Sequence, residues 1–227
     1  MRVKICGITS VADVVAATQA GADAIGLNFV AGPRRIDLDC ARGILTRLPP
    51  MVTPVALVNV EEDRVADPLV KLLGEFRVTH LQVYGKVTPE SLTRLMKGGF
   101  RPIPVVTVRD EGFADKAADW IVSGSSCRPY AVVLDAFDPD RSGGTGKAFR
   151  WEWVSAARDA GELGNWPPIV LAGGLDADNV SEAVRIVQPY AVDVSSGVEV
   201  EGSPGKKDAA KMRSFVRQAK SAGETTA

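Results

Sequence analysis

Eight short apolar runs rich in valine and isoleucine recur along the chain, and each is followed by a segment with helical periodicity. Alternation of this kind is typical of βα units that build a parallel sheet. The predicted strands cover residues 3–8, 24–30, 53–60, 80–85, 101–108, 130–136, 167–173 and 191–197. A fold for this chain must therefore place eight parallel strands and their crossover segments around a shared core.

The segments between the runs carry helical signals of their own. Residues 180–187 and 212–219 each repeat apolar side chains at positions i, i+3, i+4 and i+7, a stripe that can cover a sheet. Thr88 is an expected N-cap, and Asp176 is an expected cap for the helix that follows it. The weakest helical signal lies in residues 112–130, where glycine and serine blur its end.

Length favours one of the two architectures that repeated βα units can form. The 227 residues are a normal length for a (β/α)8 barrel. An open doubly wound sheet is the competing architecture, but no G-x-G-x-x-G motif follows the first strand. We therefore predict an α/β fold with one TIM-barrel domain over residues 1–227, of which 220–227 form a flexible tail. Such barrels place their chemistry on the loops after the strands.

Composition narrows the class of partner. The formal net charge is −1 with both signs spread along the chain, and no apolar run approaches the length of a membrane span. We expect a small-molecule partner rather than nucleic acid or a membrane, and a cytoplasmic location, since the start of the chain does not resemble a signal sequence. Three scattered cysteines and the single His80 predict neither a disulfide framework nor a metal site.

Glycine and serine gather after the seventh and eighth predicted strands. In barrels these two loops together form a recurring phosphate site, because their backbone N–H groups can approach an anion. The alternative is that these glycines only turn the chain tightly. The predicted phosphate contacts are Gly173, Gly174, Ser195, Ser196 and Gly197.

Two candidate proton-transfer groups end strands on opposite sides of the predicted barrel. Cys6 ends the first strand, and Lys4 shares its face, where a cation favours the thiolate. Asp135 ends the sixth strand, where a carboxylate must be solvated, paired or held near a substrate. The alternatives are a small buried hydrophobe for Cys6, and for Asp135 a cap or a partner of Lys147 or Arg141.

Other polar residues also lie near strand ends. Arg34 and Arg35 follow the second strand, where a guanidinium can fork onto a substrate carboxylate or stay on a solvated surface. Asp193 lies inside the eighth strand, either as a structural hydrogen-bonding partner or as a substrate contact. Residues 140–149 end a glycine-rich segment in Gly-Lys, but two defining positions of a P-loop are absent, which disfavours a nucleotide site.

Taken in order, these motifs resemble those of the phosphoribosylanthranilate isomerase family. The resemblance runs from residue 3 to about residue 208, so it covers most of the chain. The motifs that carry it are VKICGIT, GPRRI, LVN, LQVYG, VLDA with GGTGKAFRW, LAGGL with DNV, and DVSSGVE with PGKKD.

The resemblance implies a reaction and a role for several residues. The family carries out a cofactor-free Amadori rearrangement in tryptophan biosynthesis, turning N-(5-phosphoribosyl)anthranilate into 1-(2-carboxyphenylamino)-1-deoxyribulose 5-phosphate. By similarity, Cys6 is the general base and at least partly thiolate, Asp135 is the general acid and protonated when substrate binds, and Arg34 contacts the anthranilate carboxylate. The GGTGK segment resembles the family's mobile loop.

Several positions depart from the family pattern and keep alternatives open. Tyr84 stands where histidine is common, and Lys86, Ala148 and Arg150 replace other polar residues. A paralogous isomerase of another phosphoribosyl aminosugar, or a non-catalytic phosphate-binding barrel, is the alternative. The related histidine-pathway isomerase is disfavoured, since the first half lacks a second phosphate motif and Cys6 stands where aspartate is common. The sequence is compatible with a monomer or a homodimer.

Overall fold

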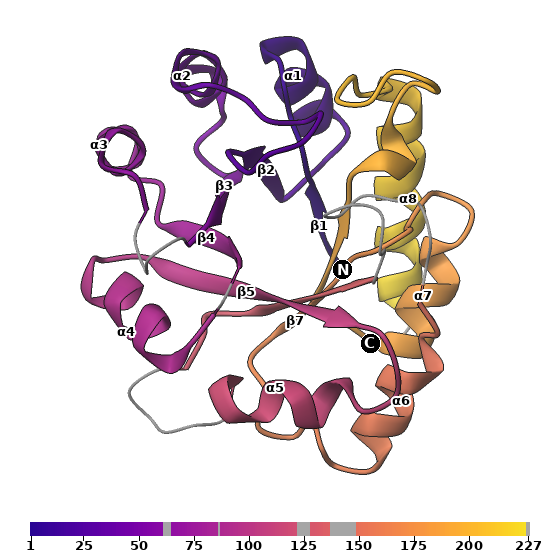
Figure 1. Ribbon diagram of the computed structural model, residues 1–227. Helices are drawn as coiled ribbons and strands as arrows, with labels where there is room; N and C mark the ends of the chain where they lie inside the picture. The colour runs from indigo at the N-terminus through magenta and orange to yellow at the C-terminus, as the bar shows by residue number, and fades with distance from the viewer. Residues whose placement is uncertain (61–64, 86, 122–127, 137–148, 226–227) are drawn as a thin grey trace.

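A closed barrel of eight parallel strands forms the centre of the molecule in the computed structural model, which describes residues 1–60, 65–85, 87–121, 128–136 and 149–225 (Figure 1). Each strand pairs with the next along the chain, and the eighth pairs with the first. The predicted (β/α)8 barrel is confirmed. Its strands are β1 (Arg2–Ile5), β2 (Ala24–Asn28), β3 (Thr53–Asn59), β4 (His80–Tyr84), β5 (Arg101–Val108), β6 (Val132–Ala136), β7 (Ile169–Leu171) and β8 (Ala191–Val194).

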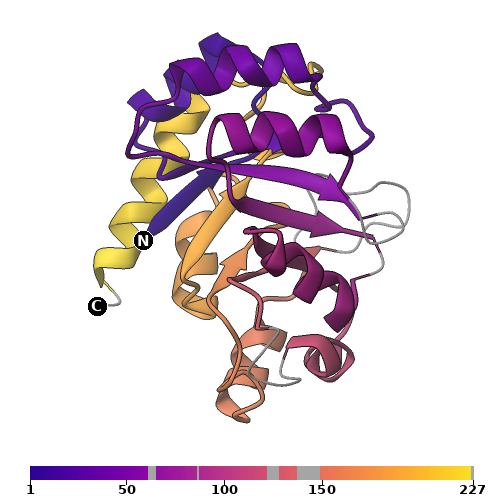
Figure 2. The same ribbon diagram turned by 90° about the vertical axis from the view of Figure 1, so that its left-hand side faces the viewer.

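Helices surround the strands, as the two perpendicular views show (Figures 1 and 2). In the described part of the chain, one α-helix follows each strand and a short 3₁₀ helix, η1 (Ser196–Val198), comes directly after β8. The α-helices are α1 (Val11–Gln19), α2 (Leu38–Arg47), α3 (Asp67–Glu75), α4 (Pro89–Lys97), α5 (Phe113–Ile121), α6 (Glu152–Asp159), α7 (Val180–Val187) and α8 (Ala209–Thr225). No helix of the described residues is long and apolar enough to cross a membrane.

Strand periodicity explains which side chains enter the barrel. Successive side chains of a strand point to opposite faces. In β6, Val132 and Leu134 pack in the large core between strands and helices, whereas Val133 packs in a smaller cluster inside the barrel. The side chain of Asp135 follows the same alternation and faces inward at the mouth. The sequence pattern thus places polar groups inside the barrel at the carboxyl ends of the strands.

The predicted helical stripes and both predicted caps are confirmed. The i, i+3, i+4, i+7 residues of α7 and α8 are buried in the core. Thr88 forms a capping box with Ser91 at the start of α4. Asp176 caps the turn that leads into α7: its carboxylate accepts from the N–H groups of Asp178 and Asn179, and its carbonyl accepts from the N–H of Val180, the first residue of α7.

The C-terminal region also differs from expectation. Residues 220–225, predicted as tail, continue α8, because Ala222 extends its buried stripe and Gly223 packs against Met1. A Cβ built at Gly223 would lie 2.6 Å from the Met1 Cβ, so the end of α8 is held beside the N-terminus. Residues 226–227 lie outside the described part, as do residues 122–127 after α5, the region of the weakest helical signal.

Candidate active site

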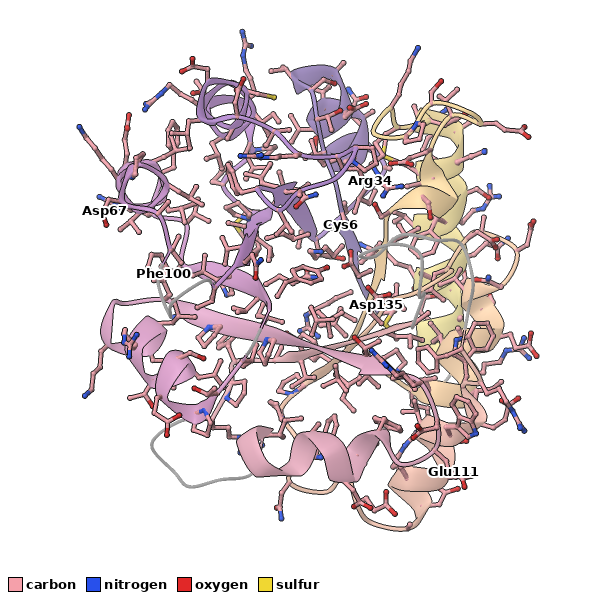
Figure 3. All side chains as sticks on the ribbon, in the orientation of Figure 1. Cys6, Arg34, Asp67, Phe100, Glu111 and Asp135 are labelled. Carbon is pink, nitrogen blue, oxygen red and sulfur yellow. The ribbon has the colours of Figure 1, made fainter. Side chains whose placement is uncertain are left out.

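A cavity opens at the carboxyl ends of the strands. All predicted site residues except Gly197 line it. Figure 3 shows Cys6 and Asp135 near the middle of the barrel and Arg34 beside them, while Asp67, Phe100 and Glu111 lie at the periphery. The lining residues are Cys6, Gly7, Asn28, Val30, Ala31, Arg34, Leu57, Gln82, Tyr84, Asp135, Ala172, Gly173, Gly174, Leu175, Asp193, Ser195 and Ser196.

Cys6 is buried directly after β1, and Lys4 lies beside it as predicted. Both side chains lie over Gly26 of β2, where an added Cβ would meet the Cys6 Sγ at 2.6 Å and the Lys4 Nζ at 3.2 Å. Burial raises the pKa of the Cys6 thiol above its ordinary value, and the Lys4 charge opposes this only in part. Burial therefore opposes ionisation of the resting thiol, and the neighbouring Lys4 charge favours the thiolate.

Lys4 is the centre of a buried polar network. Its Nζ donates to Asp193 Oδ2 at 2.7 Å and to Gln82 Oε1 at 3.0 Å. Because a lysine ammonium only donates, the Gln82 amide must turn its oxygen to Lys4 and its Nε2 to the Tyr84 hydroxyl, 2.9 Å away. The Tyr84 oxygen thus accepts, and its own proton is free for an acceptor in the cavity. Burial raises the pKa of Tyr84 well above its ordinary value, so the phenol keeps this proton.

Asp193 uses only one of its two carboxylate oxygens. Oδ2 pairs with Lys4, whereas Oδ1 is buried and has no hydrogen-bond partner among the described residues. An unpaired buried acceptor is costly, so its place on the cavity wall suits a ligand hydroxyl that would donate to it. Burial raises the pKa of Asp193, and Lys4 opposes that shift. The structure thus assigns Asp193 one structural bond and leaves one oxygen available.

Asp135 is the next-to-last residue of β6 and lines the cavity, and its Oδ1 accepts from the Ala136 N–H at 2.9 Å. Burial, and then the negative charge of Asp193, raise the pKa of Asp135 to about 6. Gly173 lets this strand end approach the next one, since an added Cβ would lie 2.4 Å from the Ala136 nitrogen. The carboxyl group therefore holds a proton more readily than an ordinary aspartate does.

The loops after β7 and β8 present unused backbone donors. In the described part of the chain, the N–H groups of Gly173, Gly174, Ser196 and Gly197 make no hydrogen bond. Asn179 fixes the first loop: its Nδ2 donates to the Gly174 carbonyl at 2.8 Å, and its Oδ1 accepts from the Asp176 N–H at 3.0 Å. Orphan N–H groups held in place at a cavity edge form a suitable anion site.

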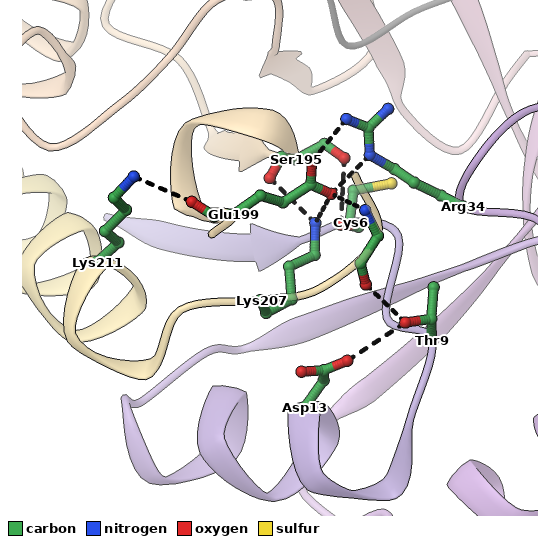
Figure 4. Close-up of polar contacts among 9 residues, drawn as sticks. Cys6, Thr9, Asp13, Arg34, Ser195, Glu199, Lys207 and Lys211 are labelled. Carbon is green, nitrogen blue, oxygen red and sulfur yellow. Dashed lines mark hydrogen bonds and ion pairs between the residues drawn. The ribbon is translucent and has the colours of Figure 1, made fainter. Parts of the chain in front are cut away.

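Arg34 reaches the cavity from the loop after β2, whereas Arg35 is exposed. The Arg34 guanidinium forms a bidentate pair with Glu199, and Lys207 also donates to that carboxylate (Figure 4). Sequence reasoning did not select Glu199, Lys207 or Gln82 as site residues. Charged residues in the DVSSGVE and PGKKD motifs, and a glutamine at an inward position of β4, were the available signals.

Some predicted features lie outside the described residues. These are the GGTGK segment with Arg141, Lys147 and Ala148, together with Lys86 and Cys127. Arg150 is described, and its guanidinium lies over the Trp153 ring, 5.7 Å from the centroid. Over the ranges that the structure describes, no group of three or more His, Cys, Asp and Glu side chains is arranged to hold a metal ion.

Comparison with known proteins identifies the family. A model of N-(5'-phosphoribosyl)anthranilate (PRA) isomerase matches residues 3–218. The chain belongs to this family. The isomerase of Trichlorobacter lovleyi is 43% identical over 223 residues, covering 98% of this chain and 99% of that protein. The isomerase of Pseudomonas putida KT2440 is 43% identical over 229 residues, with 98% of each chain covered. The predicted family is therefore confirmed.

Solved structures of phosphoribosylanthranilate isomerases share the fold. The Thermotoga maritima enzyme superposes with a TM-score of 0.82 at 33% identity, covering 97% of this chain and 99% of that one. A structure in complex with reduced 1-(o-carboxyphenylamino)-1-deoxyribulose 5-phosphate gives a TM-score of 0.78 at 31% identity, with the same coverage. These structures thus match nearly the whole of this chain.

Proposed function

We propose that this chain isomerises N-(5'-phosphoribosyl)anthranilate to 1-(2-carboxyphenylamino)-1-deoxyribulose 5-phosphate, with Cys6 and Asp135 as its proton-transfer groups. The observation that carries the proposal is one cavity with a buried thiol directly after β1, a carboxyl of raised pKa on β6, and unpaired N–H groups on the loops after β7 and β8. Acid and base catalysis on two faces of a sugar requires this arrangement.

The proposed chemistry moves protons and uses no redox partner. Asp135 gives its proton to the furanose ring oxygen as the C1–O bond breaks, and the nitrogen lone pair forms a C1=N bond, which gives an iminium ion. Cys6, as thiolate, then removes the C2 proton, which converts the iminium ion to a neutral enolamine. The ketone forms when C1 takes up one proton and the C2 hydroxyl loses one, so the rearrangement leaves the number of protons unchanged. The loops after β7 and β8 hold the phosphate, and the free Asp193 oxygen accepts from a sugar hydroxyl.

Arg34→Ala is expected to raise KM about 10- to 100-fold with little change in kcat. The residue is assigned to the anthranilate carboxylate, which does not react, and a lost charge-assisted hydrogen bond is worth about 1.5–3 kcal/mol. Arg35→Ala is the matched control, because Arg35 is exposed on the same loop. Steady-state kinetics of both variants check the assignment. An unchanged KM for Arg34→Ala, with a raised KM for Arg35→Ala, would move the carboxylate contact to Arg35.

The pH dependence of kcat/KM follows from the two raised pKa values. The active form needs protonated Asp135, with a pKa of about 6, and ionised Cys6, whose pKa lies above that of an ordinary thiol. Between the two pKa values most molecules have an ionised Asp135 and a protonated Cys6. The small fraction with protonated Asp135 and ionised Cys6 does not change with pH in this range. We expect kcat/KM to rise up to about pH 6, stay flat, and fall only above the Cys6 pKa. A fall that begins near pH 6 would show that Cys6 ionises below Asp135.

A substrate comparison tests the proposed function against the paralogue alternative. Turnover of N-(5'-phosphoribosyl)anthranilate is measured beside that of an aminoaldose with two phosphates and no anthranilate. The proposal requires kcat/KM to favour the anthranilate substrate by at least about 10³-fold, as a site built for its carboxylate would. Preference for the other substrate would make the chain a paralogous isomerase. We place the reaction in the cytoplasm, in a monomer or a homodimer; one solved structure is of monomers generated from the dimeric T. maritima isomerase.

A further inference from the structure

Glu199, at the edge of the cavity, has a buried carboxylate that accepts hydrogen bonds from three residues. Its Oε1 accepts from Arg34 Nε at 2.7 Å, from Lys207 Nζ at 3.0 Å and from the Gly205 N–H at 3.1 Å. Its Oε2 accepts from Arg34 Nη2 at 2.8 Å. Glu199 therefore joins the loop after β2 to the segment after β8 (Figure 4).

The pairing uses one edge of the Arg34 guanidinium and leaves the other free. Nε and Nη2 form the side edge, which Glu199 fills. Nη1 makes no hydrogen bond to a described residue, and Figure 4 draws no contact from the second terminal nitrogen. The end edge, formed by Nη1 and the remaining Nη2 hydrogen, is a second fork of the kind that binds a carboxylate. The stem of Arg34 is also confined, because its Cδ would meet a Cβ at Gly7 at 2.6 Å.

Lys207 sets the charge of this cluster. Its side chain is fully buried, and besides Glu199 it contacts the Ser195 carbonyl at 3.0 Å. One carboxylate thus faces two cations, so Glu199 does not cancel the charge of Arg34. Arg34 keeps a net attraction for a further anion. The contact to Ser195 couples the same cluster to the loop with the orphan N–H groups.

We propose that Glu199 and Lys207 are positioning residues for Arg34: Glu199 holds the side edge so that the end edge faces the substrate carboxylate, and Lys207 offsets the charge of Glu199 so that the cluster keeps a net positive charge toward that carboxylate. The proposal rests on the assignment of Arg34 to the substrate carboxylate. It also explains why Arg34 suits this role. An unrestrained arginine would lose side-chain entropy on binding the carboxylate, whereas Arg34 is already held in place.

Binding of two matched ligands tests the proposal. One is reduced 1-(o-carboxyphenylamino)-1-deoxyribulose 5-phosphate, and the other is the same molecule without its carboxyl group. In Glu199→Gln, an amide N–H donor faces the guanidinium, which is also a donor. We expect Kd for the carboxylated ligand to rise about 10-fold or more. Kd for the ligand without the carboxyl group should change less than about 2-fold. KM should rise likewise, with kcat within about 3-fold. In an Arg34→Ala background, Glu199→Gln should add nothing.

Lys207→Gln is the second variant, because it keeps a donor and removes only the charge. It should weaken the carboxylated ligand selectively, whereas Lys211→Met, which loses only a bond to the Glu199 backbone carbonyl, should not. Retained binding of the ligand without the carboxyl group shows that each variant is folded.

The outcomes separate this proposal from the one on which it rests. Equal weakening of both ligands by Glu199→Gln would reduce Glu199 to a structural role, and tighter binding of the carboxylated ligand would mean that Glu199 competes with it for Arg34. Either result overturns the proposal. If Arg34→Ala itself fails to discriminate between the two ligands, the carboxylate assignment of Arg34 is wrong and the proposal falls with it.

Discussion

Cys6→Ala is expected to lower kcat by about 10²-fold or more while the protein stays folded. Among the described residues of β1 and the position directly after it, the Cys6 thiol is the cavity-lining group that can take the C2 proton, because Lys4 is held protonated by Asp193. Burial by itself lowers the pKa of Lys4, but Asp193 and Cys6 outweigh it and raise the pKa. Stopped-flow or steady-state assays at saturating substrate measure the loss.

Cys40→Ala is the matched control for this variant. Cys40 is partly buried, and its Sγ donates to the Thr9 carbonyl outside the cavity. We expect its kcat to be unchanged. Near-normal turnover of Cys6→Ala would remove Cys6 from the mechanism, and an equal loss in both variants would point to damaged packing instead of a lost base.

Asp135→Asn is expected to lower kcat by about 10²- to 10⁴-fold and to stabilise the fold at neutral pH. Asparagine keeps the shape but cannot protonate the ring oxygen. The stability effect follows from the pKa of about 6, raised by burial. Between about pH 4 and 6 the folded state binds more protons than the unfolded state, so stability falls as pH rises through this window. Above it, the charged carboxylate costs about 1–3 kcal/mol.

Thermal melts at two pH values check the second half of this prediction. The variant should melt several degrees above the wild type at pH 8 and close to it at pH 4, where Asp135 is already protonated. Asp159→Asn, at an exposed position at the end of α6, makes the same charge change and should alter neither turnover nor the melting difference. A variant that is inactive but destabilised at pH 8 would mean that Asp135 is held by partners that favour its charge.

The barrel could be predicted from the sequence because both of its signals are local. Runs of valine and isoleucine predict the strands, and apolar stripes such as those of α7 and α8 predict the helices. The alternation of side chains along β6 places Asp135 on the inner face of the barrel. Predictions failed where a boundary depended on tertiary contacts. The C-terminal boundary is the example: α8 extends past residue 220 because Met1 packs on it.

The candidate site was predictable in its members and less so in its electrostatics. Position at a strand end selected Cys6 and Asp135, and Lys4 was correctly placed beside Cys6. The ionisation of that thiol depends on how deeply the closed barrel buries it, which a strand pattern does not state. Glu199 and Lys207 were missed for a similar reason: they meet Arg34 only when the segment after β8 folds back over the loop after β2.

The most direct test of isomerase activity is the fluorescence decay of freshly made N-(5'-phosphoribosyl)anthranilate on addition of the purified protein. We expect rapid, protein-dependent decay that Asp135→Asn abolishes and Asp159→Asn preserves. No decay with the wild-type protein, under conditions in which a known isomerase consumes the substrate, would contradict the proposed function and favour a non-catalytic phosphate-binding barrel or another substrate.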